Sequence, residues 1–230
     1  MRISRNRNRV NSMVSIDTLD KIDAVVGKIK ELSFAKFDES IDLAINLNVD
    51  TKKSDQIIRG VISLPYGVGK EKRVLAICVS GDEEKCLHAG ASYAGGDDLI
   101  KKIEDGFFDF DVIVTVPNMM VKLMKLGKIL GPKGLMPNMK NGGIATDVEQ
   151  AIKNFKNGQI EYRADKSGII HNSVGRVSFS IDNIIANIKH FITHLIHHKP
   201  QTVKGNFIKS IYLSSTMGRS FMVDIKSLNI

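Results

Sequence analysis

The sequence lacks any apolar run long enough to cross a membrane, and no apolar segment follows its basic first residues as a secretory signal would require. Cysteine is also scarce. Cys78 and Cys86 do not have the spacing of zinc ligands, and they predict buried thiols rather than a disulfide framework. We therefore expect a soluble, cytoplasmic protein.

Motifs for catalysis and nucleotide binding are also missing. The sequence contains no nucleophile elbow. The glycine-rich stretches 67–70 and 131–134 lack the spacing of a phosphate-binding loop, so ordinary turns are favoured over nucleotide sites. We predict no enzymatic activity and no cofactor.

A group of histidines raises the question of a metal site. His190 and His194 are four residues apart, as metal ligands on one helix face are, but no glutamate stands beside His190 and no cysteine is near. Together with His197 and His198 they are interpreted as side chains favoured at a helix C-terminus. We predict no metal site.

Charge is unevenly distributed along the 230 residues. The net charge is +8, and residues 159–230 hold nine basic against four acidic residues, whereas residues 66–158 are nearly neutral. A basic excess of this kind favours a polyanionic partner. RNA is favoured over DNA because no helix-turn-helix or zinc finger is visible, and because hydroxyl-bearing residues on a sheet suit contacts with ribose.

Both ends of the chain have the periodicities of an antiparallel α+β layer. Residues 17–32 show helical spacing behind a cap candidate at Thr18, and residues 40–49 alternate apolar and polar side chains as a half-buried strand does. Further strands and one long amphipathic helix complete the pattern. We predict the strands at 60–64, 177–180, 207–214 and 221–224, and the helix at 181–196.

The middle of the chain has a different pattern. Residues 73–79 and 110–116 are nearly continuous apolar strands, and helical runs at 82–89 and 97–105 lie between them, as in a parallel α/β layer. Two more helices are predicted, at 121–130 and, behind a capping box that starts at Thr146, up to Lys156.

These patterns predict two domains. Neither end segment has enough strands and helices to close a core alone, so one domain built from both ends is the simplest arrangement. We predict a discontinuous α+β domain of residues 1–65 plus 159–230, and an inserted, Rossmann-like parallel α/β domain of residues 66–158. The chain returns to the first domain through residues 159–173, which have the pattern of a β-hairpin with Asp165–Gly168 at its tip.

Several segments resemble the bacterial form of the L-one family of large-subunit ribosomal proteins. The similarity extends over nearly the whole chain in one order. Met139 departs from the family pattern, which usually has a second proline at that position of the inserted domain. The matching segments are LGKILGPKGLMPN (126–138), YRADKSGIIH (162–171), STMG (215–218), KFDES (36–40) and SDQ with RG (54–56, 59–60).

The resemblance implies a structural constituent of the large ribosomal subunit. In that family the discontinuous domain binds a helix-and-loop region of large-subunit rRNA, which forms a mobile stalk near the tRNA exit site and assists the exit of deacylated tRNA. Many bacterial members also bind their own operon mRNA and repress its translation. The resemblance further implies a monomer when free and a ribosome-bound, cytoplasmic location.

Carried over by position, the family's RNA surface combines cations, hydroxyl groups and apolar side chains. The cations can neutralise phosphates, the hydroxyl groups can contact sugars, and the apolar side chains can press on a ribose or a base. Asp165 either accepts from RNA or orients its basic neighbours. The implied residues are Lys36, Phe37, Ser40, Arg163, Asp165, Lys166, His171, Ser210, Thr216, Met217 and Gly218.

Other interpretations remain open at the level of sequence. An enzyme or nucleotide-binding protein could use the inserted α/β unit, although no phosphate loop or catalytic pair supports it. Repression of the messenger could be the main role, because it uses the same surface. His171 could be structural or could contact RNA.

Overall fold

The structure, a computed structural model, describes residues 20–78, 81–203 and 205–228, so the predicted cap at Thr18 lies outside it. The chain divides into two compact units. The first combines the described residues up to Gly69 with those from Tyr162 onward, and the second runs from Lys70 to Glu161. The first unit is therefore assembled from both ends of the chain, and the second is inserted between them.

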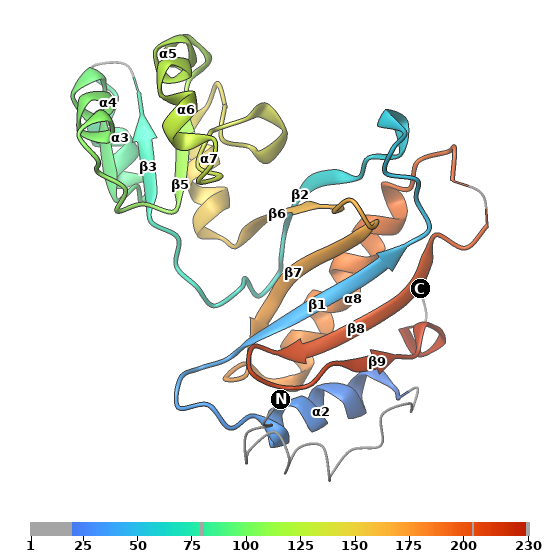
Figure 1. Cartoon of the computed structure of the whole chain (residues 1–230). Helices are drawn as coiled ribbons and strands as arrows, with labels where there is room; N and C mark the ends of the chain where they lie inside the picture. The colour runs from blue at the N-terminus through green and yellow to red at the C-terminus, as the bar shows by residue number, and fades with distance from the viewer. Residues whose placement is uncertain (1–19, 79–80, 204, 229–230) are drawn as a thin grey trace, which may run out of the picture. The chain divides into compact units, whose positions relative to one another are not determined.

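A four-stranded antiparallel sheet forms the centre of the first unit, with the strand order β7-β1-β8-β9 (Figure 1). The alternation predicted for β1 is confirmed, since every second residue from Ile41 to Leu47 is buried. Burial on alternate positions leaves the other face of the strand polar and partly exposed. The strands are β1 (Ser40–Leu47), β7 (Ile169–Arg176), β8 (Ile208–Ser215) and β9 (Phe221–Val223).

Two amphipathic helices, α2 (Ile22–Leu32) and α8 (Ile181–His197), pack on the buried face of this sheet. Both are predicted from their apolar spacing, and the structure confirms them. In α8 the Ser180 hydroxyl accepts a hydrogen bond from Asn183 N at 3.3 Å and caps the helix start. Figure 1 shows α8 behind β1 and β7, so the face turned toward the viewer is the polar one.

One polar side chain lies within the apolar face of α8. Asn187 is fully buried, and its amide donates to Val174 O and to Gly67 O, both at 2.9 Å. Its carbonyl oxygen accepts from Tyr66 N at 3.1 Å. Asn187 therefore ties the segment that leaves β2 to both α8 and β7.

The predicted hairpin is only partly correct. Its tip is a turn, but β6 (Gln159–Arg163) pairs with β2 (Arg59–Ser63), whereas β7 pairs with β1. An isolated bridge between Ala164 and Ile170 joins the two arms next to the turn. The arms separate because β7 pairs with β1 and buries Ile170 and Val174 in the four-stranded sheet.

The strand predicted at residues 177–180 is wrong, because β7 ends at Arg176 and a turn follows. Phe179 N donates to Arg176 O at 3.0 Å and closes this turn. Ser178 bonds to the Asp38 carboxylate through both its amide and its hydroxyl. Ser180 caps α8, so residues 178–180 are used in a turn, in contacts with Asp38 and in a helix cap rather than in a strand.

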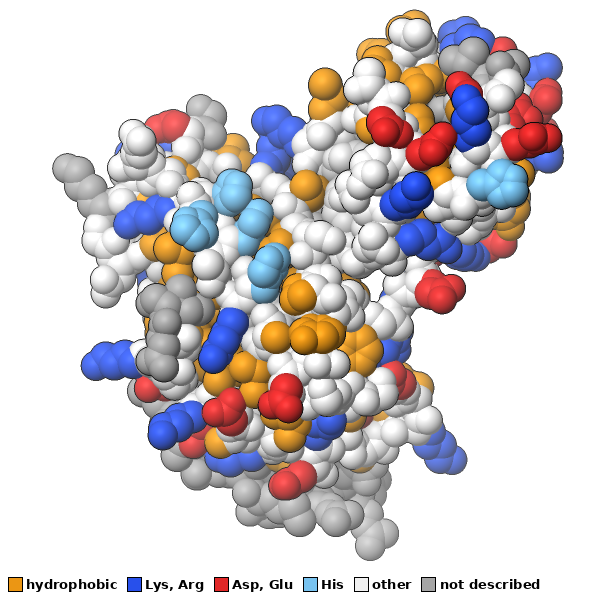
Figure 2. Space-filling model, turned by 180° about the vertical axis from the view of Figure 1, so that it is seen from behind, with side chains coloured by type: hydrophobic (Ala, Val, Ile, Leu, Met, Phe, Trp, Pro, Cys, Tyr) orange, Lys and Arg blue, Asp and Glu red, His pale blue; other side chains and the backbone are white. Residues whose placement is uncertain are grey.

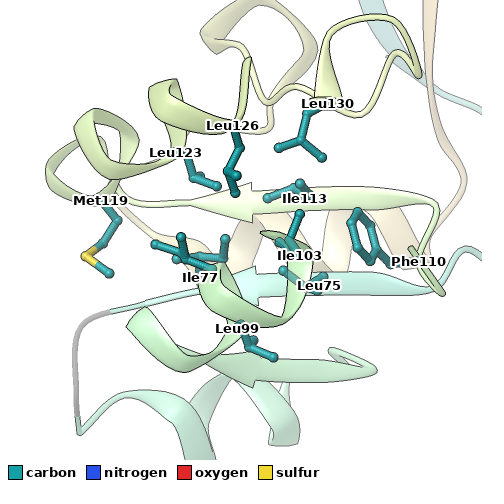
Figure 3. Packing of buried hydrophobic residues seen from close by; sticks show 11 residues of the cluster. Leu75, Ile77, Leu99, Ile103, Phe110, Ile113, Met119, Leu123, Leu126 and Leu130 are labelled. Carbon is teal, nitrogen blue, oxygen red and sulfur yellow. The ribbon is translucent and has the colours of Figure 1, made fainter. Parts of the chain in front are cut away.

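A parallel sheet with the strand order β4-β3-β5 forms the second unit, as its continuous apolar runs predict. The strands are β3 (Val74–Ile77), β4 (Tyr93–Gly95), which the sequence pattern missed, and β5 (Val112–Thr115). Apolar clusters lie on both faces, and Figure 3 shows one of them, in which Leu75, Ile77 and Ile113 meet side chains from the covering helices. Those helices are α3 (Glu83–His88), α4 (Asp97–Glu104), α5 (Pro117–Leu123), α6 (Gly127–Leu130) and α7 (Val148–Lys156).

Some local predictions in the second unit need correction. The helix predicted at 121–130 is broken into the end of α5, a 3₁₀ turn at Met124–Leu126 and α6. The cap of α7 is Asp147 rather than Thr146, since its carboxylate accepts from Gln150 N at 3.1 Å. Short 3₁₀ helices also occur at Ser54–Gln56, Met139–Asn141 and Ile225–Leu228.

The remaining sequence expectations for this unit concern its thiols and its helices. Cys78 and Cys86 are buried and free, as predicted, and burial raises the pKa of Cys86 to about 12. None of the described helices is long and apolar enough to span a membrane.

Candidate RNA interface

The turn at Asp165–Gly168 is held by the Asp165 side chain. Its Oδ1 accepts from Ser167 N at 2.8 Å and from Ile169 N at 2.9 Å, and Gly168 has a positive φ of 78°. The hydrogen bond from Ile169 N, followed by that from Ser167 N, lowers the pKa of the Asp165 carboxyl despite some desolvation. The acid in this basic region is therefore part of the turn structure.

Two cations lie at this turn, and the described part of the chain gives neither a counter-charge. Arg163 and Lys166 are exposed, and neither forms an ion pair with any residue that the structure describes. The Thr51 hydroxyl donates to Lys166 O at 2.7 Å and holds the turn against the preceding loop. Both cations are thus available to phosphate groups.

A second group of predicted residues lies at the other end of β1. Ser40 and Thr216 are joined by their backbones and by a hydrogen bond from Ser40 N to Thr216 Oγ1 at 3.0 Å. Phe37 and Met217 are each 56% exposed, which is unusual for large apolar side chains and leaves them free to contact a ligand. Lys36 is exposed beside them and forms no ion pair with a described residue.

Gly218 closes the loop that carries Met217. Its amide donates to Ser215 O at 3.1 Å, and a Cβ at this position would lie 2.3 Å from Ser215 Oγ. A Cβ here would therefore force the Ser215 hydroxyl to move, and that hydroxyl also bonds to Glu39. Gly218 fixes the position of the loop, which adds a structural reason for its presence among the predicted residues.

Glu39 connects these two loops, although the sequence does not single it out. It is 1% exposed; Oε1 accepts from Ala35 N and Oε2 from Met217 N, both at 3.1 Å. Burial raises the pKa of this carboxyl, but the Ser215 hydroxyl and the surrounding amides lower it by more, so its pKa lies below the ordinary value. Glu39 therefore stays ionised and holds the loops that present Phe37 and Met217.

Replacing Glu39 with glutamine tests this role. The amide NH₂ of Glu39→Gln would face a backbone N–H, so we expect unfolding to become easier by about 2 kcal/mol, the scale of a hydrogen bond to a charged group. Because the folded pKa is depressed, the contribution of Glu39 is present above its unfolded pKa and is lost as pH falls through the folded value. Thermal melts at pH 7 and at pH 3 check both points.

The control for this prediction is Glu31→Gln, since Glu31 is exposed on α2. The control should leave the pH 7 melt unchanged. A Glu39→Gln protein that melts like the wild type at pH 7 would contradict the proposal that the Glu39 carboxylate holds the two loops together.

The polar face of the sheet extends between the two groups. Across it His171 on β7 and Tyr212 on β8 flank Ala44 of β1, and all three are at least partly exposed. Asp42 of β1 lies two residues before Ala44, on the same face. Burial raises the pKa of the Asp42 carboxyl, and the Ser173 hydroxyl and His171 offset only part of this increase. The face is therefore lined mainly by hydroxyl, imidazole and carboxyl groups.

The predicted residues thus fall into two groups with a sheet face between them. Ser210 lies opposite Asn46 on this face but is only 8% exposed, so it offers a ligand little surface. The two groups lie at the two ends of β1, which has eight residues and therefore spans about 24 Å at the usual rise per residue. Tyr212 and Asp42 were missed by sequence reasoning, although the alternation of β1 places Asp42 on the polar face.

The histidine group of α8 shows no sign of a ligand site. The His194 and His198 rings stack at 4.2 Å, and His198 Nδ1 lies 2.8 Å from His194 O at the helix end (the group is visible in Figure 2). Burial, followed by repulsion from His198, His190 and His197, lowers the pKa of His194. Among the described residues no cluster of three or more His, Cys, Asp or Glu side chains could hold a metal ion.

Comparison with known proteins defines the class. The profile of the "Ribosomal protein L1p/L10e family" matches residues 29–219, and the two-unit α/β and α+β fold agrees with it. The class is that of structural ribosomal proteins, which are not enzymes. This chain belongs to the ribosomal protein L1 family.

Curated relatives agree over nearly the whole chain. The chain is 45% identical over 228 residues to "Large ribosomal subunit protein uL1" of Bacteroides thetaiotaomicron, covering 99% of this chain and 98% of the relative. It is 44% identical over 223 residues to the protein of the same name from Amoebophilus asiaticus, covering 97% and 96%. With that of Phocaeicola vulgatus the identity is 48% over 200 residues, covering 87% and 86%.

Proposed function

We propose that this chain is a protein of the large ribosomal subunit whose first unit binds large-subunit rRNA at the mobile stalk. Family membership supports the ribosomal role and the ribosome-bound, cytoplasmic location. The assignment of RNA binding to the unit built from both chain ends rests on the site geometry. The observation that carries it is the placement, at both ends of β1 and on either side of a polar sheet face, of cations that form no ion pair with any described residue.

Each part of this surface suits a different part of RNA. Lys36, Arg163 and Lys166 neutralise phosphates, while Phe37 and Met217 pack against a sugar or a base. The hydroxyl groups of Ser40 and Thr216 and the His171 imidazole contact ribose, and Ser210 on β8 adds only a small exposed surface. Asp165 and Gly218 act by fixing the two loops, as their hydrogen bonds indicate.

The same surface is proposed to bind the messenger of the protein's own operon and repress its translation. A protein with one RNA surface binds either RNA but not both together, so free protein would reach the messenger when rRNA sites are filled. The proposal rests on the similarity of the predicted site to that of the bacterial family. A monomer is sufficient for both roles, because all the proposed contacts lie on one unit of one chain.

Assistance to the exit of deacylated tRNA is the third part of the proposal. Residues 112–146 of the second unit contain five lysines and no acidic residue. Lys122 is paired with Asp97, and Lys133 lies over the Phe108 ring at 3.3 Å, but Lys125, Lys128 and Lys140 are exposed and form no ion pair with described residues. These three cations support contact with a second polyanion.

A footprint on total ribosomal RNA tests the proposal. We expect protection confined to one helix-and-loop region of the large-subunit rRNA, and competition for the protein by leader mRNA of its own operon. Added tRNA should leave that footprint in place, because it is proposed to use other cations. Protection spread evenly over both rRNAs would contradict a specific site, and a footprint insensitive to leader mRNA would contradict repression through this surface.

A further inference from the structure

A pocket of about 400 Å³ lies beside the Asp165–Gly168 turn. Pockets for small organic ligands start at about 300 Å³, so this one has room for a single nucleotide. Three of its residues belong to the predicted RNA surface, whereas Thr51, Ile57 and Ala164 do not. The lining residues are Thr51, Ile57, Arg163, Ala164, Asp165 and Lys166.

The walls of the pocket are fixed by hydrogen bonds between separate segments. Thr51 Oγ1 donates to Lys166 O at 2.7 Å, and Ala164 N donates to Ile58 O at 2.9 Å. The buried side chain of Gln56 accepts from Asp50 N at 2.8 Å and holds the loop that carries Thr51. The pocket is therefore formed before a ligand arrives, which reduces the entropy lost on binding.

The chemistry of the walls is that of a nucleotide site. Ile57 is 44% exposed and offers an apolar surface to a base. Arg163 and Lys166 offer positive charge to a phosphate, and the planar guanidinium of Arg163 can also stack on a base. The Asp165 carboxylate is engaged by the turn amides. A small free anion would leave Ile57 uncovered.

We propose that this pocket holds one unstacked nucleotide of a bound RNA, with its base against Ile57 and its phosphate beside Arg163 and Lys166. The pocket is open to solvent, so a nucleotide can enter while it remains part of its chain. Sequence-specific binding of RNA generally uses such splayed, unpaired bases. The inference rests on the proposed function and adds Thr51 and Ile57 to the RNA surface.

A double-mutant cycle tests the proposal. The variant Ile57→Ala is combined with a set of rRNA stalk fragments in which one unpaired nucleotide at a time lacks its base. We expect Ile57→Ala to weaken binding about tenfold, which is the scale of losing one stacked base. Removing the base at one position of the RNA should weaken binding of the wild-type protein by a similar factor. The two changes together should weaken binding no further than either alone, with an unchanged salt dependence.

The matched control is Ile225→Ala, since Ile225 is 37% exposed in another part of the same unit. It should leave the affinity unchanged and should couple to no abasic position. Thermal melts of both variants establish that the first unit is folded, which is expected because both side chains are at the surface. A set of tRNA substrates with abasic positions forms the second arm, and coupling confined to tRNA would make tRNA the source of the nucleotide.

The outcomes separate this inference from the proposed function. If Phe37→Ala weakens binding but Ile57→Ala couples to no abasic position in either RNA, the pocket inference is wrong and the wider RNA surface stands. If neither variant changes affinity for the stalk fragment, the proposed function of this surface fails as well. Coupling between Ile57 and one nucleotide supports the pocket whichever RNA supplies it.

Discussion

Reversing the charge of Lys36 and Lys166 together should weaken binding to the rRNA stalk fragment by roughly a hundredfold at moderate salt. These lysines lie at opposite ends of β1, and neither has a counter-charge among the described residues. Each phosphate contact releases counterions, so the slope of log affinity against log salt should fall by about one for each lysine removed from the interface. Filter binding of Lys36→Glu/Lys166→Glu at several salt concentrations measures both quantities.

The control carries the same change of net charge elsewhere on the first unit. Lys189 is exposed on α8, the helix that Figure 1 shows behind the sheet. Lys226 is exposed near the C-terminus. Lys189→Glu/Lys226→Glu should weaken binding only slightly through the long-range field. Equal losses in the two double variants would show that net charge, rather than this surface, determines affinity.

Removing the Asn187 side chain should give the largest loss of stability among the changes considered. Asn187→Ala leaves Val174 O without its partner in a buried position, and it also removes the partner of Tyr66 N and of Gly67 O, which are part-buried. Unpaired buried polar groups cost about 1–3 kcal/mol each before water enters, so we expect a loss of about 3 kcal/mol. Urea unfolding followed by circular dichroism, together with hydrogen exchange of the α8 amides, measures it.

Two comparisons make this result specific. Asn183→Ala changes the same residue type on the same helix, but the Asn183 side chain is only partly buried, so it should cost less than about 0.5 kcal/mol. Amides of the second unit, from Lys70 to Glu161, should keep their exchange rates in Asn187→Ala. A loss no greater than that of Asn183→Ala would contradict the role assigned to the Asn187 network.

Elements with strong periodicity were predictable from the sequence. The alternation of β1, the apolar stripe of α8 and the continuous runs of β3 and β5 each reflect burial on one or both faces, which the order of apolar and polar residues reveals. The turn at 177–180 was misassigned because its hydrogen bonds to Asp38 join residues 140 positions apart. Local pattern carries no information about such partners.

The residues of the candidate site could be predicted from the family resemblance, but the contacts that hold them together could not. The family resemblance supplied Phe37 and Met217, but not the buried carboxylate of Glu39, which joins their loops across 178 positions. It also left the role of Asp165 open, and only the two amide hydrogen bonds assign that side chain to the turn. The sequence analysis does not single out Asn187, because two of its three partners, Tyr66 N and Gly67 O, lie more than a hundred positions away.

The placement of β1 has a consequence for the order of events during synthesis. β1 is made early, but its neighbours β7 and β8 come from the last third of the chain, and Ser40 meets Thr216 across 176 positions. A chain emerging from the ribosome therefore carries Lys36 and Phe37 long before the loop that positions them exists. Only a copy made as far as Thr216 can present the whole of the proposed RNA surface.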